Sequence, residues 1–223
     1  MRTTLRLSIS FALAVSMLAI CAVVSAESRI GADGKAWVAG RTYQGENIDV
    51  DLPGDLHMKN IGSRADGAGM CVMSSIEHAA LWQGLEEYKG LRDWCAKEPG
   101  GGYPSKVEKQ LAAFCRAKNL PAPKYLQYEG PDVEQVIEAA LKSGRMACVT
   151  YGWGERYGQS IAHMVNLVKY SGQYAVVLDN NFPGEQAYEW APKAEHIRRV
   201  KLPRNSGWVF VWLNVPPPPS PRN

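Results

Sequence analysis

Cys71 has the type and the position to support covalent chemistry. It follows a glycine-rich loop, Gly62 to Gly69, and opens a segment that runs to Gln83 with apolar residues at helical spacing. The pKa of a cysteine in the first turn of a helix is lowered, because the unpaired amides and the helix dipole favour the thiolate. The sequence therefore predicts a nucleophilic thiol. The alternative is that Cys71 is half of a disulfide or a small core residue.

His163 could act as the base for such a thiol. It lies in the apolar segment 162–167, and Asp179 and Asn180 follow it along the chain. An early cysteine followed much later by a histidine and an Asn or Asp is the order that cysteine peptidases use. A histidine in an apolar strand is more often a core residue, so the prediction depends on the cysteine and the histidine together.

Three parts of the chain resemble the papain superfamily of cysteine peptidases. They are DGAGMCVMSS at 66–75, GGYP at 101–104, and HMVNLV at 163–168 followed by YAVVLDNNF at 174–182. The resemblance extends over residues 60–215, and it includes the bacterial leader peptidases of the same fold, which use Asp as the third member. It implies a cleft between a helical lobe and a sheet lobe, with Cys71 attacking a peptide carbonyl and His163 as its base.

The third member of the site is either Asp179 or Asn180, because side chains alternate between the faces of a strand. A two-residue turn at Ser171-Gly172 would place Asn180 opposite His163, whereas a three-residue turn through Gln173 would place Asp179 on the face of His163. The resemblance leaves both open: Asn180 begins a segment similar to papain's Asn-Ser-Trp, and Asp179 has the papain spacing from the histidine. Asp179 is favoured, because a carboxylate also stabilises the imidazolium.

Two positions depart from the pattern of the papain family. The oxyanion-binding glutamine, six residues before the cysteine, is replaced by Ala65, and the tryptophan that usually follows the cysteine is replaced by Val72. Asn60 and Ser63 are candidates for the missing donor, whose loss typically costs about 10²–10³ in rate. The expected function is an exported cysteine hydrolase that cleaves a peptide or amide bond. The alternatives are a catalytically silent papain-like domain that binds peptide or a partner protein, and a cell-wall amidase.

The segments that must position these residues change in character along the chain. Helix signals come first, in 71–83, in a segment with a capping box at Ser105 and Glu108, and in another with a capping box at Asp132 and Gln135. Strand signals follow at 146–151, 161–170, 174–178 and 208–215, with a short helix around 193–199. The sequence predicts the α+β class, papain-like, with an N-terminal helical half packed on a C-terminal antiparallel sheet half and a cleft between them.

The two ends of the chain are expected to lie outside this domain. Residues 1–26 combine a basic start, an apolar middle and small residues before the cleavage point, which is typical of a signal peptide. Residues 27–59 are expected to form an irregular leading arm that could include one short strand, and residues 216–223 a proline-rich tail. The predicted location is secreted or periplasmic, with no membrane association after cleavage.

Composition narrows the expected partners. The chain has 25 basic and 22 acidic side chains, and the loss of Arg2 and Arg6 with the signal peptide leaves a net charge of +1. This balance argues against nucleic acid held by bulk charge, so the expected partner is a peptide or protein substrate. No cofactor is expected, and no metal site, because no pair of cysteines has zinc-ligand spacing.

Four cysteines remain after removal of the signal peptide, and four cysteines allow three disulfide connectivities. If Cys71 is a free nucleophile, at most one bridge can form. We expect that bridge between Cys95 and Cys115, and we expect Cys148 to be a buried thiol in the apolar segment 146–151.

Overall fold

A computed structural model describes the protein over residues 27–30, 35–39, 52–53, 58–143, 145–154, 157, 159–171, 174–183, 187–202 and 207–214. The predicted signal peptide (1–26) and the proline-rich tail (216–223) lie outside the described residues. Within the leading arm, three short strands pair antiparallel in the order β1-β2-β3: β1 (Glu27–Ile30), β2 (Lys35–Ala39) and β3 (Leu52–Pro53). The arm therefore contains more strand than its sequence pattern indicated.

A six-stranded antiparallel sheet has the strand order β4-β9-β5-β6-β7-β8. Its strands are β4 (Tyr125–Glu129), β5 (Ala147–Gly154), β6 (Gln159–Ser171), β7 (Tyr174–Leu178), β8 (Tyr188–Pro192) and β9 (Trp208–Trp212). The predicted bounds of β7 are confirmed, and β5, β6 and β9 overlap the predicted segments. β4 and β8 were not predicted, since neither segment has a sustained apolar alternation.

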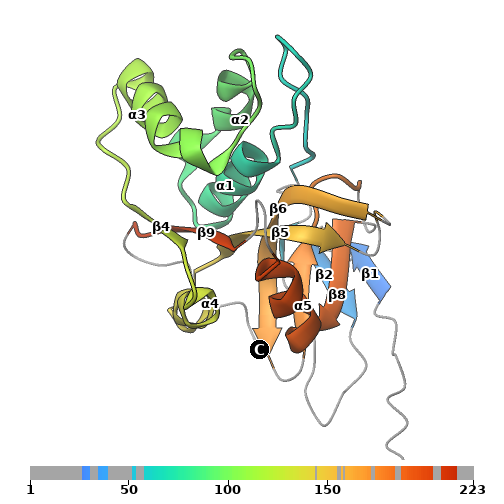
Figure 1. The fold of residues 1–223 in the computed structure, drawn as a ribbon. Helices are drawn as coiled ribbons and strands as arrows, with labels where there is room; N and C mark the ends of the chain where they lie inside the picture. Colours follow the sequence, from blue (N-terminus) through green and yellow to red (C-terminus); the bar gives the residue numbers. More distant parts are fainter. Residues whose placement is uncertain are drawn as a thin grey trace, which may run out of the picture.

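Helices complete a mixed helix and antiparallel sheet architecture, so the predicted α+β class is confirmed. They are α1 (Cys71–Trp82), α2 (Leu91–Cys95), α3 (Val107–Lys118), α4 (Val133–Lys142) and α5 (Lys193–Val200), with short 3₁₀ helices η2 (Glu86–Tyr88) and η3 (Pro104–Lys106). Figure 1 shows α1, α2 and α3 grouped on one side of the sheet, away from α4 and α5. Within the described ranges, no helix has both the length and the apolarity needed to cross a membrane.

The two predicted capping boxes do not form, although α3 and α4 begin near the predicted positions. The 3₁₀ helix η3 precedes α3, so that Lys106 and not Ser105 is its N-cap. Asp132 is the N-cap of α4, but its side chain makes no capping hydrogen bond. Burial of Val133 and Ile137 holds α4 in place instead, which is the usual source of helix stability in a protein.

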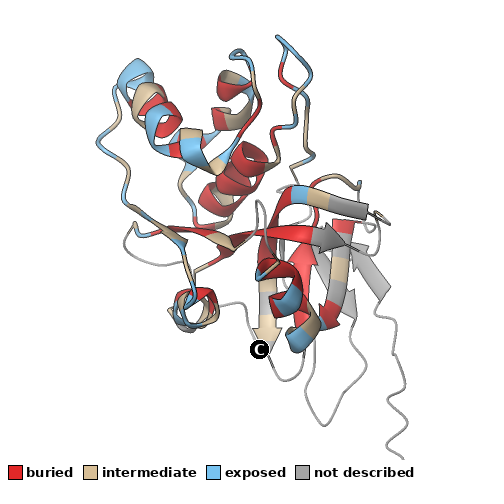
Figure 2. Ribbon diagram, in the orientation of Figure 1, coloured by how far each residue is buried: buried red, intermediate tan, exposed pale blue. Residues whose placement is uncertain are grey.

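Buried apolar residues separate by parity along the strands into two clusters, because successive side chains point to opposite faces of the sheet. Met164 and Leu178 belong to the cluster that includes α1, α2 and α3. Val165 and Val177 belong to the cluster that includes α4 and α5. Figure 2 shows the buried residues concentrated on α1 and on the central strands, so α1 lies deep in the protein.

Helix α1 is fixed to the sheet by polar contacts as well as by burial. The Trp212 indole Nε1 donates to the carbonyl of Ile76 at 2.9 Å, and the Ser75 hydroxyl donates to the carbonyl of Met164 at 3.1 Å. Both contacts are buried, where an unpaired polar group would be costly. The position of Cys71, the first residue of this helix, is therefore determined by strands far along the chain.

The predicted disulfide between Cys95 and Cys115 is not formed. All four cysteines that the structure describes are free thiols. Burial raises the pKa of both thiols, with the Tyr88 hydroxyl as a polar neighbour of Cys115 and the Glu77 carboxylate as a charged neighbour of Cys95, so the two thiols have different surroundings within the helical core. Cys148 is completely buried, as predicted, and its thiol donates to the carbonyl of Ser75.

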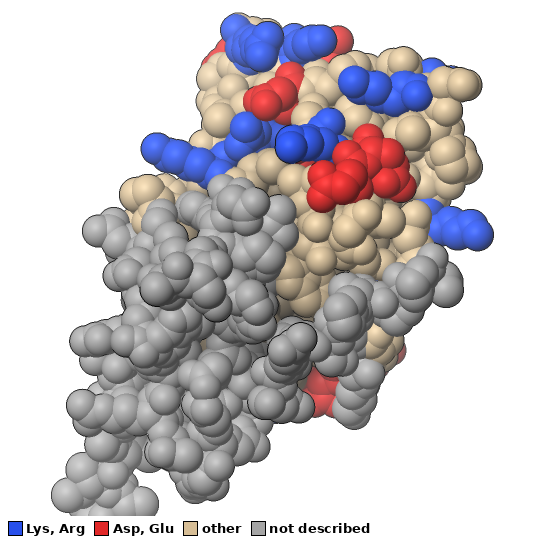
Figure 3. All heavy atoms as spheres, turned by 180° about the vertical axis from the view of Figure 1, so that it is seen from behind, with Lys and Arg blue, Asp and Glu red and all other residues tan. Residues whose placement is uncertain are grey.

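Surface charge is mixed on the face opposite to the view of Figure 1. Figure 3 shows Lys and Arg side chains beside Asp and Glu side chains across the part of this face that the structure describes. The pattern matches the near balance of 25 basic and 22 acidic residues in the chain.

His196 on α5 should make the stability of the protein depend on pH. Its side chain is buried, and burial, assisted by the charge of Arg199, lowers its pKa from 6.5 to about 4. The unfolded chain takes up this proton below pH 6.5 and the folded chain does not, so stability falls as the pH decreases toward 4. Between pH 7 and pH 5 the free energy of unfolding should drop by about 2 kcal/mol from this residue.

Urea unfolding followed by tryptophan fluorescence at the two pH values measures the effect. The variant His196→Leu should lose this part of the pH dependence. An identical drop in the wild type and the variant would contradict the assignment to His196.

Candidate functional site

The loop before Cys71 is a short hairpin held by its own backbone. Gly62 and Gly69 form an isolated antiparallel bridge, and a Cβ on Gly62 would lie 2.9 Å from the carbonyl oxygen of Gly67. Asp66 accepts hydrogen bonds from the N–H groups of Ala68 and Gly100, which lower the pKa of its carboxyl. The hairpin is therefore tied to the loop near residue 100 as it leads into α1.

The glycines of the segment 101–104 allow this segment to lie directly against the hairpin. Gly101 has φ +60°, and a Cβ there would lie 2.6 Å from the carbonyl oxygen of Gly69. The N–H of Gly102 donates to the same carbonyl at 3.1 Å. Tyr103 and Pro104 are thereby brought to the pocket that Cys71 also lines.

His163 and Asp179 form a buried hydrogen-bonded pair, with 2.8 Å between His163 Nε2 and Asp179 Oδ1. Neither predicted turn produces this arrangement. Ser171 pairs with Tyr174, and the register then shifts by one residue between Leu167 and Lys169. Beyond the shift, the register places Asp179 on the face of His163. Residues 172–173 lie outside the described residues.

The Asp179 carboxylate accepts hydrogen bonds from three further groups. Tyr151 donates at 3.2 Å, Tyr157 lies 2.9 and 3.0 Å from the two carboxylate oxygens, and the backbone N–H of Asn181 donates at 3.0 Å. Burial raises the pKa of Asp179, but the hydrogen bond and charge of His163 and the other donors outweigh it and lower the pKa overall. The carboxylate is therefore ionised and fixed in orientation.

Cys71 and His163 line the same pocket, and each favours the charged form of the other. Burial raises the pKa of the Cys71 thiol, but the interaction with His163 lowers it below its ordinary value. Burial likewise lowers the pKa of His163, and the hydrogen bond with Asp179 and the nearby Cys71 thiol raise it to about 9. The geometry therefore favours a thiolate and imidazolium pair at neutral pH, at the start of a helix where an anion is stabilised.

Asn180 contacts the nucleophile side of the site. Its Nδ2 lies 3.1 Å from the carbonyl oxygen of Cys71, 2.9 Å from the Ser75 hydroxyl and 3.2 Å from the carbonyl oxygen of Met164. The alternating strand therefore directs Asp179 to the histidine and Asn180 to helix α1. Both residues belong to the site, with different neighbours.

Of the two predicted oxyanion donors, Asn60 lines the pocket with Cys71 and Ser63 does not. The Ser63 hydroxyl donates to the carbonyl of Glu98 and accepts from the N–H of Ala65, and Ala65 itself is exposed in the hairpin. Asn60 Nδ2 donates to Asn181 Oδ1 at 2.8 Å.

Sequence reasoning missed the roles of three residues around the pair. Asn181 was noticed only as part of a motif, and its Nδ2 donates to the Tyr157 hydroxyl at 2.9 Å. Tyr151 and Tyr157 lie in and just after strand β5, and both donate to Asp179. No spacing signal marks them, because the fold alone brings their hydroxyls to Asp179.

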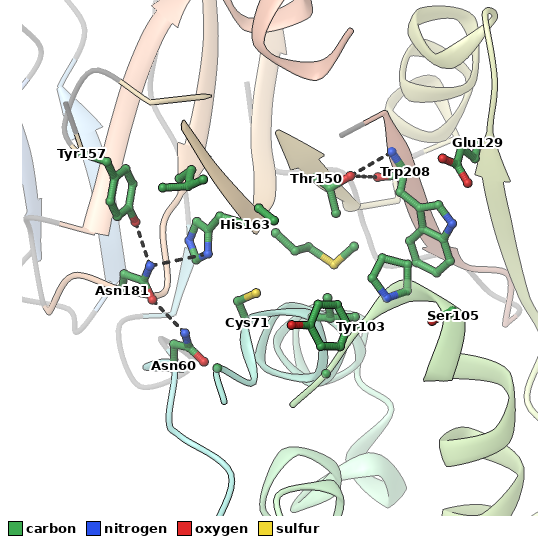
Figure 4. A pocket seen from close by; sticks show the side chains of 17 residues that line it. Asn60, Cys71, Tyr103, Ser105, Glu129, Thr150, Tyr157, His163, Asn181 and Trp208 are labelled. Carbon is green, nitrogen blue, oxygen red and sulfur yellow. Dashed lines mark hydrogen bonds between the residues drawn. The ribbon is translucent and has the colours of Figure 1, made fainter. Parts of the chain in front are cut away.

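A pocket of about 590 Å³ contains the reactive groups. Cys71 and His163 lie at its centre in Figure 4, with Asn60, Tyr157 and Asn181 on one side and Tyr103, Glu129 and Trp208 on the other. Among the residues that the structure describes, no cluster of His, Cys, Asp and Glu could hold a metal ion. The chemistry that these side chains can perform themselves is nucleophilic attack by a thiolate with a neighbouring acid and base.

Comparisons with protein-family models, curated proteins and solved structures found no match to this chain. Inferences about its function therefore rest on the geometry and chemistry described above.

Alkylation of Cys71 by iodoacetamide tests the electrostatics of the site. At pH 6 the wild-type thiol should react faster than an ordinary thiol of pKa 8.5, because His163 stabilises the thiolate. His163→Ala should slow the reaction at pH 6 at least tenfold, since burial alone raises the pKa of the thiol. Cys71→Ser measures the background from the other cysteines, whose pKa values are raised by burial.

The same assay separates the two candidates for the third member. Asp179→Asn and Asp179→Ala should both slow alkylation at pH 6, because the imidazolium loses its partner. If Asn180→Ala abolishes the reactivity while both Asp179 variants keep it, the assignment of Asp179 is wrong.

Proposed function

We propose that this protein is an exported, papain-like cysteine hydrolase that cleaves a peptide or amide bond. The observation that carries the proposal is the joint position of Cys71, His163 and Asp179: a thiol in the first turn of a helix, in one pocket with an imidazole that lowers its pKa and whose Nε2 is hydrogen bonded to a buried carboxylate. This order of nucleophile, base and orienting group is the arrangement that activates a cysteine for acyl transfer.

In the proposed reaction, the Cys71 thiolate attacks the substrate carbonyl carbon and forms a tetrahedral oxyanion. The His163 imidazolium gives its proton to the leaving amine as the C–N bond breaks, which leaves a thioester on Cys71. His163, now neutral, removes a proton from water as the water attacks the thioester, and the acid product leaves with the thiolate restored. Asp179 keeps the imidazole ring oriented through both steps and stabilises its cationic form.

Asn60 is the side-chain amide proposed to assist the oxyanion, together with the backbone N–H of Cys71. Asn60 lines the pocket beside Cys71 and is anchored through Asn181 to the same network as Asp179. An oriented donor of this kind is effective because it needs little reorganisation as negative charge develops.

A catalytically silent domain that binds a peptide is the second candidate. Two observations favour it: Ala65, at the position of the family's glutamine, is exposed outside the pocket, and the Asn60 amide group already donates to Asn181. In that case the pocket would hold a peptide without turning it over.

Hydrolysis of fluorescein-labelled casein, with mass spectrometry of the products, tests the first proposal. Wild-type protein should release peptides, and Cys71→Ala should release none.

The same assay tests the role of Asn60. Asn60→Ala should reduce kcat by about 10²-fold, the typical effect of removing one oxyanion donor. Ser63→Ala is the matched control in the same loop and should change kcat by less than about threefold, with folding of both variants checked by circular dichroism. Equal losses in the two variants would contradict the role of Asn60. A reactive Cys71 with no turnover of casein would favour the silent domain.

A further inference from the structure

One end of the pocket pairs a carboxylate with an indole. Glu129 and Trp208 are directly opposed partners on the antiparallel strands β4 and β9, and both line the pocket. Directly opposed residues have Cβ atoms about 5 Å apart, so their side chains lie next to each other. Figure 4 shows them together on the side of Cys71 that faces away from Asn60 and Tyr157.

Among the residues that the structure describes, this end of the pocket has one charged side chain, which is negative. Glu129 is the one carboxylate among the residues that line the pocket, and none of the lining residues is Lys or Arg. Lys106 is near, with its ammonium 5.8 Å from the Tyr103 ring centroid, but it donates to the carbonyls of Pro99 and Gly100 and is not a lining residue. Within the described part of the pocket, Glu129 therefore has no basic lining residue beside it.

The neighbouring walls are suited to an unbranched aliphatic chain. Tyr103 and Pro104 form one wall, and Met164 lies on the sheet side. The Gln127 side chain donates to the carbonyl of Pro104 at 3.5 Å, which connects strand β4 to the segment that carries Tyr103. An occupant would therefore contact both apolar surface and the carboxylate.

We propose that this end of the pocket, formed around Glu129 and Trp208, binds the cationic side chain of a Lys or Arg residue in the peptide substrate. A carboxylate attracts an ammonium or guanidinium group, and an indole face attracts the same cation through its quadrupole. The methylene stem would pack against Tyr103 and Pro104, as long cationic side chains commonly do. The inference rests on the proposed function in that it assigns a substrate class to the same site.

Peptide binding to the Cys71→Ala variant tests the subsite without requiring catalysis. The probes are fluorescein-labelled alanine hexapeptides in which a single Lys is moved along the chain, each matched by a peptide with norleucine at the same position. Norleucine keeps the unbranched stem and removes the charge. Fluorescence polarisation should show Lys binding about five- to tenfold tighter than norleucine at one position, the combined effect expected from a partly exposed ion pair and a cation–π contact.

Two substitutions at Glu129 and one control define the result. Glu129→Gln should reduce the preference for Lys to about twofold, and Glu129→Lys should reverse it in favour of a glutamate peptide. Glu108→Gln removes an exposed carboxylate on α3 that does not line the pocket, and it should leave the preference unchanged. Because Glu129 is also exposed, these variants should fold, and circular dichroism checks that they do.

The outcomes separate this inference from the proposed function. Absence of a Lys preference, absence of binding by any of the peptides, or a preference that survives Glu129→Gln would overturn the subsite. A Glu129-dependent preference in the binding assay, with no cleavage of quenched versions of the same peptides by wild-type protein, would support the subsite and contradict the hydrolase. Cleavage of the peptides without a preference for Lys would support the hydrolase and contradict the subsite.

Discussion

The buried carboxylate of Asp179 is the constraint on which the site depends. A charge inside a protein is tolerated only when donors surround it, and here His163, Tyr151, Tyr157 and the N–H of Asn181 do so. These donors come from β5, from the segment that follows it, from β6 and from the turn that follows β7. Satisfying one carboxylate therefore fixes several segments relative to each other, and it holds the imidazole in orientation, with its Nδ1 3.5 Å from the side-chain amide of Asn181.

Asn180, the residue after Asp179, holds the nucleophile Cys71 in position as Asp179 holds the imidazole of His163. Asn180 donates to the carbonyl of Cys71 and to Ser75, while its own carbonyl accepts the N–H of Asn60. Two adjacent residues directly after β7 thus contact the base and the nucleophile separately, because their side chains point in different directions. The hairpin before α1 is attached to the same point, so the relative position of thiol and imidazole depends on a single strand end.

Sequence patterns predicted the parts of the site that depend on local chemistry. Cys71 at a helix start and His163 in an apolar strand could be identified from residue type and spacing, and so could the main strands. The partner of His163 depended on a register shift between Leu167 and Lys169 that no local pattern marks, because a bulge is set by pairing across the sheet. The Cys95–Cys115 bridge was expected because Cys71 was predicted to be a free nucleophile and Cys148 a buried thiol, and this elimination carries no information about which thiols are neighbours in the folded core.

The attachment of α1 to distant strands has a consequence for the order of folding. The contacts that hold this helix join residues separated widely in sequence, such as Trp212 with Ile76 and Asn180 with Cys71. Such non-local contacts form late and slow the search for the native state, because a long loop must close first. A nascent chain that ends before β7 and β9 lacks both the partner of His163 and the anchor of α1. The arrangement of Cys71, His163 and Asp179 thus requires β7 and β9, and a partly synthesised chain that lacks these strands does not yet contain it.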